Sequence, residues 1–181
     1  MMTDNDNYFD NLLSKEGGYV NNPDDAGGAT HWGITEKTAR SHGYAGNMRD
    51  LTREQAIQIY RADYWYGPNF AQVDMISPAI AQELLDTGVN MGPTVASKWL
   101  QRWLSALNKQ SSLYPDLLSD GVIGPRTLSA LKKYLSVRGK EGELVLLRGI
   151  NCSQGARYLE LAEQREANET FLYGWLNTRV S

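Results

Sequence analysis

One stretch of twenty residues, EGGYVNNPDDAGGATHWGIT from Glu16 to Thr35, constrains this 181-residue chain more than any other. Glu16 follows an apolar pattern of helical spacing, and the two glycines behind it let the backbone turn at once. A polar segment rich in Asn, Pro, Asp and Gly then predicts a turn that brings the chain back. We expect residues 29–35 to follow as one short strand. A carboxylate at a helix end would thus face a hairpin-like loop with two more carboxylates and a threonine.

This grouping of side chains suits the hydrolysis of a glycosidic bond, which needs a protonated acid and a second carboxylate that handles water or positive charge. We predict Glu16 as the acid, Asp25 as the second carboxylate and Thr30 as the residue that holds the water. Asp24 is the alternative to Asp25. Structural roles compete at these positions, because turn aspartates commonly bond to backbone amides and threonine is common in strands.

A general acid must hold its proton near neutral pH. Burial beside apolar groups raises the pKa of a carboxyl group, and Tyr19 or Trp32 would supply such a setting for Glu16. Tyr64 and Trp65 are candidates for stacking on sugar rings, although core packing at a helix end explains them as well. The stereochemical outcome depends on the distance between the two carboxylates, about 5 Å for retention and about 6.5–9.5 Å for inversion.

Composition and charge argue against several classes of function. With 41% hydrophobic and 22% charged residues, the chain has the composition of an ordinary globular protein. Its net charge of -3 gives no support to binding of nucleic acid or an anionic membrane. The apolar runs are too short to span a bilayer, and the acidic N-terminus is the reverse of a signal peptide. We therefore expect a monomer that is made in the cytoplasm and has no membrane anchor.

Metal and cofactor chemistry find little support in the sequence. Cys152 is the only cysteine, which excludes an intramolecular disulfide, and no local base marks it as a nucleophile. His31 and His42 lie eleven residues apart without a His-x-x-x-His pattern. Residues 116–127 imitate part of a calcium loop but lack the acidic residue at its last position. We expect neither a metal nor a cofactor.

Helical periodicity dominates the remainder of the chain. Thr52 begins a capping box, and Ser77-Pro78 combines an N-cap with proline at the first helical position. Residues 108–124 have the character of a loop. The fold is therefore expected to be mainly α, with one small hairpin near residues 20–35. The approximate helices that we predict are 5–15, 36–43, 52–66, 77–88, 92–107, 125–134, 143–161 and 171–176.

Several motifs occur in an order that resembles the glycoside hydrolase family 108 lysozymes, a group of phage and prophage N-acetylmuramidases. They are EGGY (16–19), PDDAGGAT (23–30), GIT (33–35), IY (59–60), DYW (63–65) and DTGVNMG (86–92). A further motif, DGVIGPRTL (120–128), is similar to a predicted peptidoglycan-binding region. The resemblance implies a lysozyme-like helical catalytic region at 1–92, with its hairpin near the catalytic glutamate. It also implies a helical peptidoglycan-binding region at 93–181, packed with the first as one globular unit.

The resemblance also implies a reaction, which is cleavage of the β-1,4 bond between N-acetylmuramic acid and N-acetylglucosamine with Glu16 as the acid. Phage-type lysozymes have Glu, eight residues, Asp, five residues and Thr, whereas here Thr30 comes one residue early and His31 holds the expected place. The likeness favours inversion and puts Asn90 in the substrate cleft.

The resemblance suggests an endolysin that waits in the host cytoplasm until a holin-type pore releases it to the cell wall. Two other classes compete with this hypothesis. A zinc amidase or cysteine endopeptidase would have to build its site from His31, His42 and Cys152. A wall-binding module with an inactive site is the second.

Overall fold

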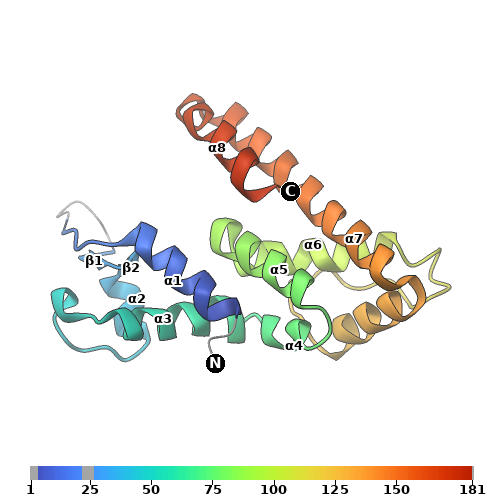
Figure 1. Cartoon of the computed structure of the whole chain (residues 1–181), viewed down its shortest axis with the longest axis horizontal. Helices are drawn as coiled ribbons and strands as arrows, with labels where there is room; N and C mark the ends of the chain where they lie inside the picture. The colour runs from blue at the N-terminus through green and yellow to red at the C-terminus, as the bar shows by residue number, and fades with distance from the viewer. Residues whose placement is uncertain (1–3, 22–26, 181) are drawn as a thin grey trace. The chain divides into compact units, whose positions relative to one another are not determined.

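The computed structural model describes residues 4–21 and 27–180, and gives only the backbone for residues 4–6, 15 and 16. The fold is mainly α-helical with one small antiparallel hairpin, which confirms the predicted fold class (Figure 1). The chain divides into two compact units, Met1–Gly67 and Pro68–Ser181, and each is described by itself. We predict a domain boundary after residue 92. It differs from the division between these two units and remains a prediction.

The first unit carries the hairpin among short helices. Helix α1 ends at the glutamate of the opening motif, and α2 and α3 begin at threonine N-caps. The capping box predicted at Thr52 is confirmed, because Thr52 Oγ1 accepts from Gln55 N (3.2 Å) and Gln55 Oε1 accepts from Thr52 N (3.0 Å). The elements are α1 (Asp4–Glu16), β1 (Thr30–His31), β2 (Ile34–Thr35), α2 (Glu36–Ser41), η1 (Met48–Asp50), α3 (Arg53–Arg61) and the π-helical turn η2 (Ala62–Tyr66).

A small apolar core holds these elements together. It combines one residue from α1 with residues from the hairpin region, α2, η1 and α3. Burial of a Leu, Ile or Met side chain stabilises a fold by about 1.5–3 kcal/mol. The buried members are Leu13, Ala29, Ile34, Ala39, Met48, Leu51, Ala56 and Ile59.

The second unit is a helical assembly built around α5, α6 and α7. Its elements are α4 (Phe70–Asp74), α5 (Pro78–Met91), α6 (Pro93–Ala106), α7 (Pro125–Gln164), η3 (Glu166–Asn168) and α8 (Glu169–Arg179). The helix predicted to end near Gly88 continues for three more residues, to Met91. Gly88 continues the helix and lets the Phe70 ring approach it, since a Cβ there would lie 3.3 Å from Phe70 Cε2.

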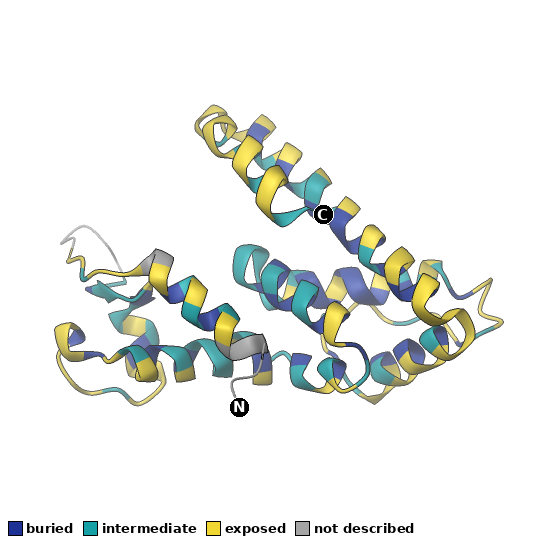
Figure 2. Ribbon diagram, viewed as in Figure 1, coloured by how far each residue is buried: buried dark blue, intermediate teal, exposed yellow. Residues whose placement is uncertain are grey.

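Helix α7 is two helices joined at a sharp kink. This agrees with the two separate helices that we predict, one starting at Pro125 and one near Glu143. Gly139 takes φ 58° and ψ -148°, values that an α-helix does not allow. Figure 1 shows the two segments strongly inclined to each other, with α8 lying along the second. None of the residues of α8 is buried, and exposed positions dominate it in Figure 2.

The loop between α6 and α7, predicted at residues 108–124, is fastened by one buried amide. Gln101 Nε2 donates to Asp120 Oδ1 (3.0 Å) and to Val122 O (2.9 Å), and Gln101 Oε1 accepts from Gly121 N (2.9 Å). Asp120 therefore stabilises the turn that precedes α7. The hydrogen bond from Val122 N, followed by that from Gln101, holds the pKa of the Asp120 carboxyl below its usual value.

A buried polar link joins the start of α5 to α7. Ser77 Oγ accepts from Ile80 N (3.2 Å) as the N-cap and donates to Glu143 Oε2 (2.6 Å). Glu143 is 9% exposed and also pairs with Lys140. The hydrogen bonds from Lys140 and then Ser77 keep the pKa of the Glu143 carboxyl below its usual value.

We predict that Ser77→Ala lowers the free energy of unfolding by about 2–3 kcal/mol. The variant loses a helix cap and also leaves a buried carboxylate with one donor fewer. The control is Thr52→Ala, which removes a cap without such a carboxylate and should cost about 1 kcal/mol. Urea denaturation measures both variants, and equal losses would show that the Glu143 contact contributes nothing.

Candidate active site

The hairpin of the first unit is built on a two-residue turn. β1 pairs with β2 in antiparallel register, Thr30 with Thr35 and His31 with Ile34. Trp32 and Gly33 form the turn with φ of 56° and 74°, the left-handed pair of a type I′ hairpin. The single strand expected over residues 29–35 is therefore wrong, because this turn splits it. Glycine adopts such a φ readily, whereas tryptophan needs support from its surroundings.

Contacts from three segments supply that support for Trp32. Its Nε1 donates to the carbonyl of Leu51 (2.9 Å), and its own carbonyl accepts from the Tyr60 hydroxyl (3.1 Å). The indole also stacks on the His31 imidazole, with ring centroids 5.1 Å apart and planes at 16°. A strained backbone of this kind costs about 1–3 kcal/mol and occurs often at functional sites.

The same tryptophan lies beside the end of α1. A Cβ placed on Gly17 would lie 3.9 Å from Trp32 Cζ3, so the indole borders the residue that follows Glu16. Val20 and Thr30 form an isolated bridge with N···O distances of 2.8 and 2.7 Å. The structure thus brings Trp32 close to the end of α1 and pairs Thr30 with Val20, four residues after Glu16.

The two candidate second carboxylates, Asp24 and Asp25, lie outside the described residues. Both belong to the segment whose ends the bridge between Val20 and Thr30 joins. The backbone N–H and carbonyl of Thr30 both bond to Val20 in this bridge, and its side chain is half-buried.

His31, which holds the place expected for threonine, is fixed by the backbone of η1. Its Nδ1 lies 2.7 Å from the carbonyl of Met48, and because a carbonyl only accepts, Nδ1 carries the proton. In the neutral ring Nε2 is then an acceptor. Tyr19 meets His31 edge to face at 6.1 Å, and the Arg49 guanidinium covers the Tyr19 ring at 4.1 Å. No motif marks Arg49 in the sequence, because its contact with Tyr19 joins segments thirty residues apart.

The aromatic candidates of the first unit differ in accessibility. Tyr64 is half-buried and stacks on Tyr60 (centroids 5.9 Å apart), whose hydroxyl reaches the hairpin. Burial, followed by the Asp63 charge, raises the pKa of the Tyr64 hydroxyl. Trp65 is only 5% exposed, whereas Tyr66 is 63% exposed. These exposures favour Tyr64 over Trp65 for stacking on a sugar.

The last candidate, Asn90, lies on α5 in the second unit. Its side-chain amide donates to the Asp86 carbonyl (2.8 Å) one turn earlier on the same helix. Glu83, half-buried on this helix, has a pKa raised to about 7 by burial and then by the Asp86 charge. Thr87 Oγ1 lies 3.4 Å from Glu83 Oε1 and partly offsets this shift. No local sequence pattern marks Glu83, because its raised pKa depends on burial in the folded protein.

The three residues that an amidase or endopeptidase site would need, His31, His42 and Cys152, each make different contacts. His42 Nε2 bonds to Asp63 Oδ1 at 2.9 Å, whereas His31 is held by η1. Cys152 is exposed on α7, in the second unit. In the part of the chain that the structure describes, no three His, Cys, Asp or Glu side chains gather as metal ligands. No helix among the described residues is long and apolar enough to cross a membrane.

Two family models match the chain in succession. The model for glycosyl hydrolase 108 matches residues 9–92, and the model described as a predicted peptidoglycan domain matches residues 95–180. Among curated proteins, none matches. The two models together support a lysozyme-like enzyme that hydrolyses peptidoglycan.

A solved structure agrees with this assignment over nearly the whole chain. The structure of Brucella abortus SagA is similar at 28% sequence identity, with a TM-score of 0.60. The similarity covers 94% of this chain and 86% of that chain. With the two family models, it confirms the resemblance found in the motifs: residues 9–92 form a glycosyl hydrolase 108 region, and the chain is a glycoside hydrolase with a predicted peptidoglycan domain behind that region.

Proposed function

We propose that the protein is an N-acetylmuramidase that cleaves the β-1,4 bond between N-acetylmuramic acid and N-acetylglucosamine, with Glu16 as the general acid. One observation carries this proposal: the end of α1, the Val20–Thr30 bridge and the Trp32 indole lie together. The match to glycosyl hydrolase 108 over residues 9–92 supports the same class of reaction.

The position of Glu16 suits an acid that must stay protonated. It is the last residue of α1, and the carbonyl groups at the C-terminal end of a helix disfavour a negative charge. The indole of Trp32, beside Gly17, is an apolar neighbour of the same helix end. In the reaction Glu16 gives its proton to the leaving glycosidic oxygen.

A second carboxylate then activates the attacking water, and we propose Asp25, with Asp24 as the alternative. Thr30 would hold that water through its hydroxyl, and the Nε2 acceptor of His31 is one residue away. The likeness to phage lysozymes favours attack from the opposite face and inversion at the anomeric carbon. Tyr64 and Asn90 are the proposed sugar contacts, with Trp65 a weaker one because of its burial.

The biological role that we propose is that of a phage or prophage endolysin that degrades the host cell wall after release through a holin-type pore. It would act as a monomer on peptidoglycan and need neither metal nor cofactor.

The first test is digestion of purified peptidoglycan by the wild type and by Glu16→Gln. We expect new reducing ends on muramic acid from the wild type, and a rate lower by about 10²- to 10⁴-fold in the variant. A reducing-end assay and mass spectrometry of the fragments measure both. Free amines or released stem peptides would instead indicate an amidase or a peptidase, and binding without cleavage by either protein would indicate a binding module.

A second pair of variants distinguishes the two aspartates. We expect Asp25→Asn to lower the rate of muropeptide release by about 10²-fold or more, because it removes the base that activates water. Asp24→Asn, which changes the adjacent residue in the same way, should stay close to the wild type. The reverse pattern would assign the role to Asp24.

Glu83→Gln is the matched control for Glu16→Gln. We expect the variant to retain hydrolysis. The stability of the wild type should change with pH, because the pKa of Glu83 is about 7 in the folded protein against 4.5 in an unfolded chain. The folded state therefore holds this proton more tightly, and wild-type stability falls between pH 4.5 and 7.

The variant lacks this loss, so its free energy of unfolding at pH 8 should exceed that of the wild type by about 2–3 kcal/mol. At pH 4 the difference should be small. Urea denaturation at the two pH values measures it. Loss of hydrolysis in Glu83→Gln would overturn the assignment of the acid to Glu16 alone.

A further inference from the structure

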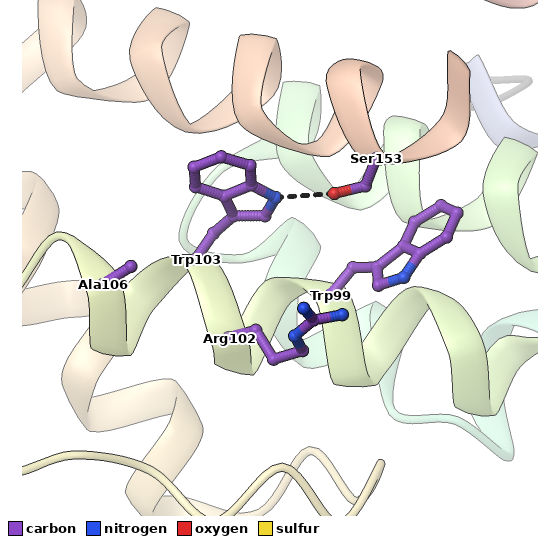
Figure 3. A pocket seen from close by; sticks show the side chains of 5 residues that line it. All are labelled: Trp99, Arg102, Trp103, Ala106 and Ser153. Atoms are coloured by element: carbon purple, nitrogen blue, oxygen red, sulfur yellow. Dashed lines mark hydrogen bonds between the residues drawn. The ribbon is translucent and has the colours of Figure 1, made fainter. Parts of the chain in front are cut away.

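A pocket of the second unit lies between α6 and α7, and no role has been assigned to it. Its volume is about 230 Å³, and its walls combine two tryptophans, an arginine, a serine and an alanine (Figure 3). Figure 3 shows both indoles extending from α6 toward the serine on α7. The lining residues are Trp99, Arg102, Trp103, Ala106 and Ser153.

Trp103 is held in one orientation by α7. A Cβ on Gly149 would lie only 2.7 Å from Trp103 Cδ2, so the indole rests on the helix backbone where no side chain intervenes. Its Nε1 donates to Ser153 Oγ at 2.9 Å. Because the ring is already fixed, binding a ligand on its open side costs little further side-chain entropy.

The pocket also offers an uncompensated positive charge. Arg102 is exposed, and within the described residues it has no ion-pair or hydrogen-bond partner. Trp99, at 9% exposure, contributes an apolar wall, and the exposed Ala106 adds a small apolar side chain to the lining. Packing in the hydrophobic core would account for the two tryptophans. It would not account for an open cavity beside an exposed guanidinium group.

We propose that this pocket binds one sugar ring of the peptidoglycan glycan, with the apolar face of the ring on Trp103 and, at Arg102, the lactyl carboxylate of a muramic acid unit that carries no stem peptide. The C–H face of a pyranose suits an aromatic surface, and guanidinium groups bind carboxylates through paired hydrogen bonds. The volume is below the roughly 300–1,000 Å³ of pockets for drug-sized ligands, which fits a single ring. The proposal rests on the proposed function for the identity of the polymer.

The test uses the full chain carrying Glu16→Gln, so that binding is measured without cleavage. Arg102→Gln removes the charge, and Ala106→Leu fills the mouth at an exposed position where no native contact is lost. Arg126→Gln is the matched control, an exposed arginine of α7 that does not line the pocket. The probes are purified peptidoglycan, the disaccharide of N-acetylglucosamine and N-acetylmuramic acid with a free lactyl carboxylate, and the neutral N-acetylglucosamine dimer.

We expect the dissociation constant for the acidic disaccharide, measured by calorimetry, to rise about three- to fivefold in Arg102→Gln. It should rise about tenfold or more in Ala106→Leu and stay unchanged in Arg126→Gln. The neutral dimer should bind more weakly than the acidic one, and Arg102→Gln should remove that difference. Cosedimentation with purified peptidoglycan from which an amidase has removed the stem peptides should show the same order of the variants.

The outcomes separate this proposal from the proposed function. Unchanged binding in both pocket variants, with cleavage intact in the wild type, would overturn the pocket and leave the muramidase. Arg102-dependent binding without any cleavage by the wild type would support the pocket and overturn the muramidase. Absence of binding to every probe would overturn the pocket, whatever the cleavage assay shows.

Discussion

The first unit depends on the indole of Trp32, which holds a strained turn in place through contacts with distant parts of the chain. The indole N–H of Trp32 donates to the Leu51 carbonyl, and the backbone carbonyl of Trp32 accepts from the Tyr60 hydroxyl. The hairpin is therefore connected both to the segment just before α3 and to the end of α3. Because the same ring borders Gly17, it helps to fix the position of the end of α1 relative to the hairpin. A catalytic glutamate at that helix end would therefore meet a rigid partner.

Trp103 in the second unit is held in the same manner as Trp32. In each case the indole N–H is bonded and the ring lies next to a glycine, Gly17 or Gly149, although only at Gly149 would a Cβ clash with it. Fixed aromatic rings are good surfaces for sugars, since little conformational entropy is lost on binding. The sugar contact proposed for Trp103 would benefit from this fixed orientation.

Local signals in the sequence predicted most of the helices, because their causes lie within a few residues. The capping box at Thr52 and the Ser77-Pro78 start are confirmed, and the kink at Gly139 falls between two helices that were predicted separately. The errors have tertiary causes. The helix from Ser77 passes Gly88, where Phe70 packs closely, and the strand expected over residues 29–35 is divided by a turn that Trp32 adopts only with help from Leu51 and Tyr60.

The sequence by itself determined the mainly α fold, the hairpin after Glu16, the family and hence the class of reaction, since these follow from local periodicity, turn residues and motifs in a set order. Only the tertiary structure decided which side chains are accessible and how they are charged. In the folded protein Trp65 is buried and Tyr64 is half-buried, the pKa of Glu83 is raised, and a pocket lies beside Arg102. Burial and desolvation arise from segments far apart in the chain, so no local pattern encodes them.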